Sequence, residues 1–317
     1  MRCIFCLEER DSSVEHVFPG AIGGTLTIDR VCKPCNDWLG ANVDALLTNH
    51  DLILLKRAQL GMHDSAGNVV DPWRKVFRIG TMADDPEQKV RFVPDSKTGQ
   101  LAPQVLYKSI RKTLDNGTDV VQITIDARQV GEIEKIIQRV HRREDLPLLS
   151  DEEIQAQIGA TKANMGRIDQ PEVKFGLEVD IWNYHRAVFK IAYELAWLWL
   201  GDEYLDDPVA EQLRNMILKD ARDGIKGKVQ FGADIAPLAP WKDEPNVHIG
   251  FCSGVGHAIC ISVRIFDSIC GAVSVSETAD RYPTIGNGNF VMIDPQTGVS
   301  RNTTLADELV RVVQRSS

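Results

Sequence analysis

The C-terminal half of the chain changes its hydrophobic period partway along. Apolar residues in 183–200 and 209–221 recur every three or four positions, which predicts two helices, and Gly201 is placed to end the first. Further along, apolar residues alternate with polar ones or form short apolar runs, which is typical of strands. The predicted strands are 247–251, 257–266, 268–276 and 290–293. Together they predict a small antiparallel sheet with helices packed against it.

The first 170 residues carry weaker patterns. Strand-like pieces precede a helix that Asn36 or Asp37 can cap. The apolar face of this helix consists of Leu39, Val43, Leu46 and Leu47. In the middle of the chain the sequence predicts strands over 75–79, 90–93 and 119–126, and a helix over 130–140. A capping box formed by Ser150 and Glu153 predicts the start of a short helix.

The chain is therefore expected to be an α+β protein built from three parts. A small module covers 1–50, an α+β region covers 51–150, and helices with an antiparallel sheet cover 171–317. The polar stretch 144–170 is the expected joint. The pattern does not identify the role of the two larger parts, for which recognition or sensing is the expectation.

The composition is that of an ordinary soluble protein, with 317 residues of which 43% are hydrophobic and 26% charged. No signal-peptide pattern follows Met1. The richest apolar run, 191–200, is about ten residues long and contains Glu194, whereas a membrane span needs about twenty. We therefore expect a cytoplasmic protein with no membrane partner.

The charge counts mildly against a nucleic-acid partner. The net charge is −9, and residues 1–50 hold four basic against seven acidic side chains, whereas phosphate binding usually leaves a basic surface. A basic cluster ends the predicted helix 130–140, and it either complements the helix C-terminus or contacts phosphate. The cluster consists of Arg139, His141, Arg142 and Arg143. If the first module cuts nucleic acid, other parts of the chain or a bound metal must help to hold the phosphates.

Four of the seven cysteines form two Cys-x-x-Cys pairs near the N-terminus. They are Cys3, Cys6, Cys32 and Cys35. In a chain without a secretion signal such pairs are typical of zinc, because two thiolates from each pair can complete a tetrahedral site. A redox-active pair is the alternative, but it usually needs one Cys-x-x-Cys in a thioredoxin-like context. The remaining cysteines are expected to be small core residues, namely Cys252, Cys260 and Cys270.

The segment between the two cysteine pairs carries the candidate chemistry. Asn36 directly follows the last of the four cysteines. The segment itself reads Glu15-His16-Val17-Phe18-Pro19, followed by Gly23-Gly24. A zinc ion would bring Asn36 beside the strand that carries Glu15 and His16. A carboxylate and an amide oxygen suit Mg²⁺ or Mn²⁺, and a histidine suits proton transfer from an attacking water, so the segment holds the parts of metal-assisted phosphodiester hydrolysis.

This arrangement resembles the HNH endonucleases in their zinc-stapled form, the recombination endonuclease VII type. The resemblance covers about 45 residues, from Cys3 to Leu47. It implies a ββα-metal fold in which the four cysteines hold a structural Zn²⁺. It also implies that His16 is the general base and that Glu15 and Asn36 bind a catalytic Mg²⁺ or Mn²⁺. The family's products are a 5′-phosphate and a 3′-hydroxyl.

The sequence departs from the family pattern at two positions. Thr27 stands where many members have an asparagine that ties the two strands together and orients the base. A threonine hydroxyl makes fewer such bonds than an amide, so a backbone carbonyl is the alternative orienting group. Glu15 replaces the commoner aspartate. Asp44, eight residues after Asn36, lies on the same predicted helix face and is either a further metal ligand or a solvated carboxylate.

The leading hypothesis is an endonuclease that hydrolyses DNA, with RNA as an alternative substrate. By analogy with small HNH modules joined to recognition domains, restriction or anti-phage defence is a candidate setting. The alternative is a non-catalytic zinc-ribbon module that binds nucleic acid or protein, which the acidic charge and Thr27 favour. A homodimer is a further candidate, because a double-strand cutter often uses two active sites.

Overall fold

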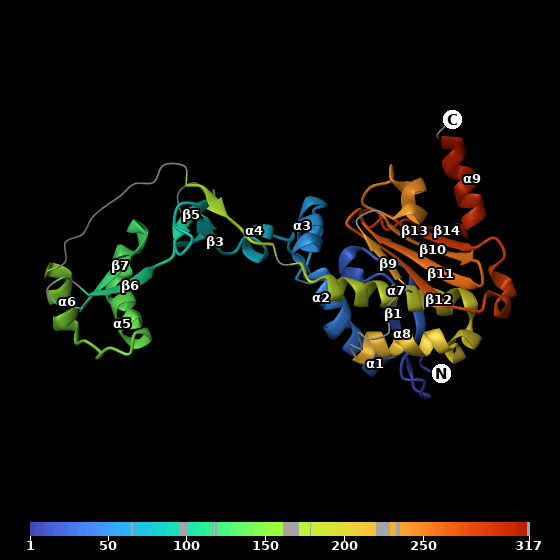
Figure 1. Ribbon diagram of the computed structural model, residues 1–317, viewed down its shortest axis with the longest axis horizontal. Coiled ribbons are helices and arrows are strands. Elements are labelled where there is room, and N and C mark those ends of the chain that lie inside the picture. Colours follow the sequence, from blue (N-terminus) through green and yellow to red (C-terminus); the bar gives the residue numbers. More distant parts are fainter. Residues whose placement is uncertain are drawn as a thin grey trace. The chain divides into compact units, whose positions relative to one another are not determined.

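Two separated stretches of sequence share the first compact unit of the chain. Met1–Val70 and Glu178–Ser317 form this unit, and Asp71–Leu177 form the second. The computed structural model (Figure 1) describes residues 1–64, 66–94, 101–113, 115, 117, 119–160, 171–177, 179–219, 229–232 and 235–315. Buried residues of the N-terminal module belong to the same hydrophobic cluster as those of the C-terminal helices and sheet. The module is therefore part of a larger core.

The N-terminal module is a hairpin followed by a helical run, which confirms the predicted ββα order. β1 (Ser12–His16) pairs antiparallel with β2 (Thr27–Cys32). The 3-10 helix η1 (Gly20–Ile22) lies between the two strands in the sequence. The helical run consists of α1 (Lys33–Leu39), the π-helical η2 (Gly40–Asp44), α2 (Ala45–Thr48) and α3 (Asp51–Gln59).

Helix α1 begins earlier than the sequence predicted. Its N-cap is Cys32, so the predicted cap at Asn36 or Asp37 is wrong. Pro34 occupies the first turn, where the missing N–H of a proline has no cost. Three of the four predicted apolar positions are buried, whereas Leu46 is 41% exposed. The buried positions are Leu39, Val43 and Leu47.

A six-stranded antiparallel sheet forms the centre of the C-terminal body, as predicted. Its strand order is β14-β13-β10-β11-β12-β9. The strands are β9 (Val229–Gly232), β10 (His248–Val255), β11 (Ala258–Ile265), β12 (Ile269–Ser276), β13 (Asn289–Ile293) and β14 (Ser300–Thr304). The two edge strands were not predicted, because β9 is short and β14 contains no apolar residue.

Helices cover both faces of this sheet. α7 (Ile181–Leu200) and α8 (Pro208–Lys219) pack on the face that shares its core with the N-terminal module. η5 (Ala236–Trp241) and α9 (Leu305–Arg315) cover the other face. The shorter 3-10 helices of this unit are η4 (Asp202–Asp206), η6 (Ala279–Arg281) and η7 (Pro283–Ile285). Within the described residues, no helix has both the length and the apolar character that a membrane crossing requires.

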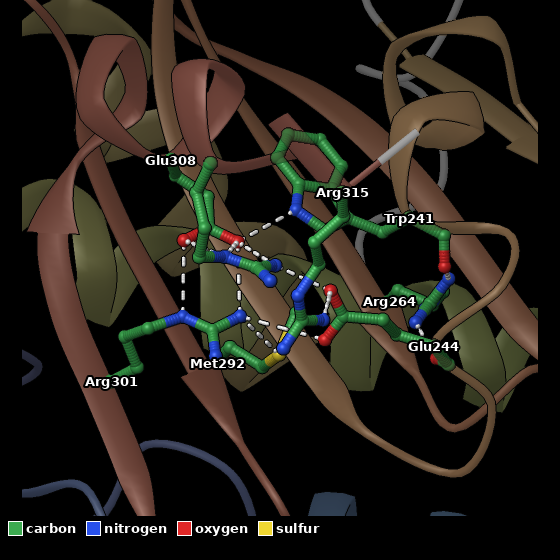
Figure 2. A network of polar contacts seen from close by, with 8 residues as sticks. Trp241, Glu244, Arg264, Met292, Arg301, Glu308 and Arg315 are labelled. Atoms are coloured by element: carbon green, nitrogen blue, oxygen red, sulfur yellow. Dashed lines mark hydrogen bonds and ion pairs between the residues drawn. The ribbon is translucent and has the colours of Figure 1, made fainter. Parts of the chain in front are cut away.

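Strand β11 is buried on both faces, although its alternating sequence predicted one exposed face. Its isoleucine and valine side chains enter the core shared with the module. On the opposite face Ser262 and Arg264 are buried as well. Arg264 donates a hydrogen bond to the backbone oxygen of Trp241 at 2.8 Å, as Figure 2 shows. A polar residue on a covered face needs such a partner, so alternation in the sequence did not imply exposure to solvent.

The second unit contains a four-stranded sheet and a separate hairpin. The sheet order is β5-β4-β3-β8, and β6 pairs with β7. The strands are β3 (Gly80–Met82), β4 (Lys89–Pro94), β5 (Leu101–Val105), β6 (Lys108–Thr113), β7 (Asp119–Thr124) and β8 (Val173–Lys174). The helices are α4 (Pro72–Lys75), η3 (Ala127–Glu132), α5 (Ile133–Arg143) and α6 (Asp151–Ala160).

The start of this unit contradicts one prediction and the start of α6 confirms another. The predicted strand 75–79 is wrong, because Asp71 caps α4 by accepting a hydrogen bond from the backbone of Trp73. The predicted capping box is present, since Ser150 Oγ accepts from the Glu153 backbone and Glu153 Oε2 accepts from the Ser150 backbone. The basic cluster lies at the end of α5, where Arg143 pairs with Glu144.

Candidate functional site

The four cysteines of the two Cys-x-x-Cys pairs converge on one point. The Sγ atoms of Cys3, Cys6, Cys32 and Cys35 all lie within 4.8 Å of one another. Those of Cys6 and Cys32 are 3.8 Å apart. A tetrahedral zinc ion with Zn–S bonds of about 2.3 Å requires S–S distances of about 3.8 Å. The four thiols therefore fit a structural zinc ion, as their spacing predicted.

The Gly-Gly pair allows the chain to turn back from β1 towards β2. Gly23 has φ +82°, and a Cβ atom there would lie 2.5 Å from the Cβ of Pro295. A Cβ atom on Gly24 would lie 1.8 Å from the carbonyl oxygen of Phe18. Neither position accepts a side chain without a shift of the chain. Close approach of the backbone therefore explains this part of the motif without a ligand.

Strand β1 divides the two central motif residues between its faces. Glu15 is buried and His16 is exposed, because successive residues of a strand point to opposite faces. In the hairpin register Glu15 lies opposite Ile28, and His16 lies opposite Thr27. Thr27, one of the two positions at which the sequence departs from the motif, thus lies directly across the hairpin from His16, the candidate base.

The imidazole of His16 lies over a glycine. A Cβ atom on Gly20 would lie 3.6 Å from Nε2 of His16, and Gly20 itself is exposed. With no side chain at position 20, nothing from this residue covers the ring. The His16 ring is therefore accessible to a molecule that approaches from solvent.

Asn36 lies beside β1, as predicted. Its Nδ2 donates hydrogen bonds to the backbone oxygen of Val14 at 2.7 Å and to Oγ of Ser13 at 3.0 Å. These bonds join α1 to β1. Because both bonds use the amide nitrogen, Oδ1 is the atom of this side chain that suits a cation. The ligand role of Asn36 stays a prediction.

A lysine from α7 contacts both central motif residues. Nζ of Lys190 lies 2.5 Å from Oε1 of Glu15 and donates a hydrogen bond to the backbone oxygen of His16 at 2.7 Å. It also lies 3.3 Å from Oδ2 of Asp44 and 3.5 Å from Oε2 of Glu194. Lys190 and Glu194 are fully buried. We call Glu15, Asp44, Lys190 and Glu194 the Lys190 cluster.

The Lys190 cluster holds more carboxylates than cations. Burial raises the pKa values of Glu15, Asp44 and Glu194, and Lys190 opposes this effect. Burial also disfavours the charged form of Lys190, but the three carboxylates outweigh it and raise the pKa of the ammonium. Apart from Lys190, no donor among the described residues bonds Oε1 of Glu15, Oδ1 of Asp44 or the two oxygens of Glu194. Buried carboxylate oxygens in this state suit a further cation.

Asp44 links the cluster to the exposed side of the site. Its carboxylate is 17% exposed, and the charge of His16 is one of the influences on its pKa, after burial and Lys190. Asp44 ends the π-helical segment η2, a kind of turn that often occurs at functional sites. The candidate extra ligand therefore lies with Glu15 around the same ammonium.

The hydrophobic pattern did not identify Lys190 or Glu194 as site residues. The signal was a lysine and a glutamate four residues apart inside the otherwise apolar run 187–200, where both side chains must be buried. Such a pair indicates a buried polar contact, but not the residues that it contacts. Its partners in the module lie well over a hundred positions earlier in the chain.

The C-terminal body also holds the module through neutral contacts. His248 of β10 is fully buried, and its Nε2 lies 2.8 Å from the backbone oxygen of Ile22. Its ring stacks on Phe18 and contacts Phe266. These contacts fix the turn that follows His16, so the geometry of the site depends on the sheet as well as on the four cysteines.

Comparison with known proteins bears on the N-terminal module. Residues 3–52 match the model of a family described as HNH endonuclease. The matched segment contains the four cysteines, His16, Glu15, Asn36 and Asp44, but not Lys190 or Glu194. No curated protein and no solved structure matches the chain.

Proposed function

We propose, from the premise that residues 3–52 form an HNH endonuclease domain with a four-cysteine cluster, that this protein hydrolyses phosphodiester bonds of DNA. In this proposal His16 is the general base, and Glu15 and Asn36 hold a divalent Mg²⁺ or Mn²⁺ ion. Cys3, Cys6, Cys32 and Cys35 hold the structural zinc ion.

The proposal rests on the different surroundings of Glu15 and His16 on the two faces of β1. The exposed His16 ring lies over Gly20, where a water molecule and a phosphodiester can approach it. The imidazole can take a proton from that water. Lys190 holds the backbone oxygen of His16, and Asn36 holds the strand at Val14, so the ring is carried by a fixed strand.

The donor atoms near His16 fit a divalent ion. Glu15 pairs with Lys190 through Oε1, which leaves Oε2 as the atom that faces an ion in this proposal. Together with Oδ1 of Asn36 and the Asp44 carboxylate, these are hard oxygen donors of the kind that Mg²⁺ and Mn²⁺ prefer. When bound, the ion supplies Lewis-acid stabilisation of the charge on the scissile phosphate. It also compensates for the shortage of basic residues in the module.

A cleavage assay with matched histidine variants tests the proposal. Zinc-loaded protein is incubated with plasmid DNA, single-stranded DNA or RNA in the presence of Mn²⁺ or Mg²⁺. His16→Ala is expected to lower the DNA cleavage rate about 10²- to 10⁴-fold, because proton transfer by a positioned side chain contributes that much. His257→Ala, at an exposed position of the β10–β11 turn, is the control and should cleave like the wild type. Unchanged cleavage by His16→Ala would exclude the mechanism, and cleavage of RNA alone would exclude DNA as the substrate.

The acidic charge favours a second candidate, a zinc-ribbon module that binds nucleic acid or protein without cleaving it. Wild-type protein that binds nucleic acid, contains zinc and divalent metal, and still cleaves none of the three substrates would support this candidate. A role in restriction or anti-phage defence rests on analogy with other HNH proteins and needs evidence from cells.

A further inference from the structure

Lys190 contacts the proposed ion site from outside the HNH domain. It lies on α7 of the C-terminal body, and it contacts a carboxylate of β1, one of η2 and one of its own helix. Its Nζ is fully buried, so no water from bulk solvent shares these contacts. Two of the three carboxylates, Glu15 and Asp44, are the groups proposed to face the divalent ion.

The ammonium and a divalent ion act on the same two carboxylates. Lys190 already neutralises part of the charge of Glu15 and Asp44, and its positive charge repels a second cation bound nearby. A buried ammonium therefore lowers the affinity of these carboxylates for the ion. In return it keeps them, and the backbone of His16, in place when the ion is absent.

We propose that Lys190 is a positioning residue of the nuclease site, which weakens the binding of the divalent ion while it fixes the strand that carries His16. The proposal rests on the proposed function for the identity of the site. Glu194, four residues further along α7, is the carboxylate that holds Lys190 from its own helix. The ion affinity of the HNH domain is thereby set by a helix of the C-terminal body.

Two effects of opposite sign follow for Lys190→Met, which keeps the length of the side chain and removes its charge. Mn²⁺ should bind at least about tenfold more tightly, because the carboxylates lose a competing cation at contact distance. The kcat at saturating Mn²⁺ should fall, because the backbone oxygen of His16 loses its donor. A lysine with a purely structural role would lower both the affinity and the rate.

The measurement is Mn²⁺ binding to the zinc-loaded protein, by calorimetry or by electron paramagnetic resonance of free Mn²⁺, beside the cleavage assay. Mn²⁺ prefers oxygen donors and does not compete for the four thiolates. Lys56→Met is the matched control, because Lys56 is also buried in the same unit and pairs with Asp267 at 2.7 Å. This variant should bind Mn²⁺ like the wild type.

A second pair of variants covers the case in which Lys190→Met does not fold. Glu194→Gln and the double variant Lys190→Met with Glu194→Gln differ only in the ammonium, and the double variant leaves fewer buried carboxylates without a cation. The double variant should bind Mn²⁺ at least about tenfold more tightly than Glu194→Gln. An affinity that is unchanged or weaker in either pair would overturn the proposal.

The outcomes separate this inference from the proposed function. Cleavage that is insensitive to His16→Ala contradicts the assigned mechanism and leaves the Mn²⁺ affinities unaffected. Tighter Mn²⁺ binding without the loss of kcat would overturn the positioning role of Lys190 even where the nuclease proposal holds.

Discussion

Two clusters of buried charged groups in the first unit neutralise their carboxylates differently. On the face of the sheet that α9 covers, Glu308 is 1% exposed and accepts hydrogen bonds from Trp241, Arg301 and Arg311, each at 3.0 Å. Glu244 pairs with the same two arginines and with Arg315 at 3.2 Å. Figure 2 shows the contacts of both carboxylates with Trp241, Arg301 and Arg315. Three guanidinium groups thus face two carboxylates, and we call this group the Glu308 cluster.

The Lys190 cluster, which joins the N-terminal module to α7, has the opposite balance. Three carboxylates face one ammonium in it. The four thiols of the module converge on one point. Buried charge without a counter-charge is costly, so an excess of buried carboxylates suits a cation from solution. The comparison supports a structural role for the Glu308 cluster and agrees with the zinc and divalent-ion sites proposed for the module.

Removal of zinc should have the largest effect. Cys32→Ser is expected to unfold the module and to destabilise the unit by several kcal/mol, because structural zinc contributes roughly 10 kcal/mol in isolated zinc fingers and contacts such as His248 with Ile22 retain only part of the fold. Zinc content and limited proteolysis of residues 1–70 measure the outcome. Cys260→Ser, on β11 outside the cluster, is the control. A zinc-free protein as stable as the wild type would show that the thiols need no metal.

Breaking the Glu308 cluster should come next. Glu308→Gln is expected to lower the free energy of unfolding by about 3–5 kcal/mol, because Arg301 and Arg311 lose the carboxylate that pairs with them below the surface. Urea denaturation at pH 7 measures the change, and divalent ions should not alter it. A loss below about 1 kcal/mol would place the Glu308 cluster among ordinary surface ion pairs.

Acidification should affect His248, which joins the module to the sheet, before it affects either cluster. Burial lowers the pKa of His248 from 6.5 to about 4. Between these values the unfolded chain binds a proton that the folded protein does not bind, so stability is lost as the pH falls from about 6.5 to about 4. The difference corresponds to about 3 kcal/mol.

Urea denaturation across this pH range, with His248→Gln beside the wild type, isolates the effect of His248. The variant should be less stable at pH 7 but should lose less stability on acidification. Burial raises the pKa of Glu308, but hydrogen bonds from Arg311, Trp241 and Arg301 outweigh burial and lower it. The Glu308 cluster should therefore weaken only at lower pH, below the usual glutamate range. A variant with the same acid sensitivity as the wild type would contradict a neutral, buried His248.

The same two regions show why sequence predicts one part of the site and not another. Local spacing was sufficient for the four thiols. Strand alternation explains why Glu15 and His16 point to opposite faces of β1, but this separation was not predicted. Lys190 could not be placed, because its contact with His16 spans 174 positions of the chain and depends on how α7 packs. The sequence pattern around a buried polar residue indicates that the residue is buried, but it does not indicate which residue it contacts.

Errors in the predicted elements have similar causes. The strand expected at 75–79 was read from apolar residues, but Asp71 and Pro72 start a helix there, and local capping outweighs a weak alternation. The polar face of β11 was expected to meet solvent, yet η5 covers it and Arg264 bonds to the backbone of that helix. Which element covers a strand depends on the whole fold, so the sequence of the strand alone does not predict it.

Glu194→Gln should have the smallest effect, and its sign distinguishes the two regions most directly. Glutamine has the shape of the glutamate and no charge, and apart from the ion pair with Lys190 at 3.5 Å the Glu194 carboxylate has no hydrogen-bond donor among the described residues. Because the Lys190 cluster has a surplus of carboxylates, loss of one should change the free energy of unfolding by less than about 1 kcal/mol, or stabilise the protein. Glu308→Gln is the matched control, since that glutamate is equally buried and its cluster has no surplus. Urea denaturation of both variants without divalent ions decides the matter. A loss of about 3 kcal/mol or more for Glu194→Gln would mean that Lys190 depends on Glu194 for its charge balance, and the Lys190 cluster would then be as complete a structural element as the Glu308 cluster on the other face of the sheet.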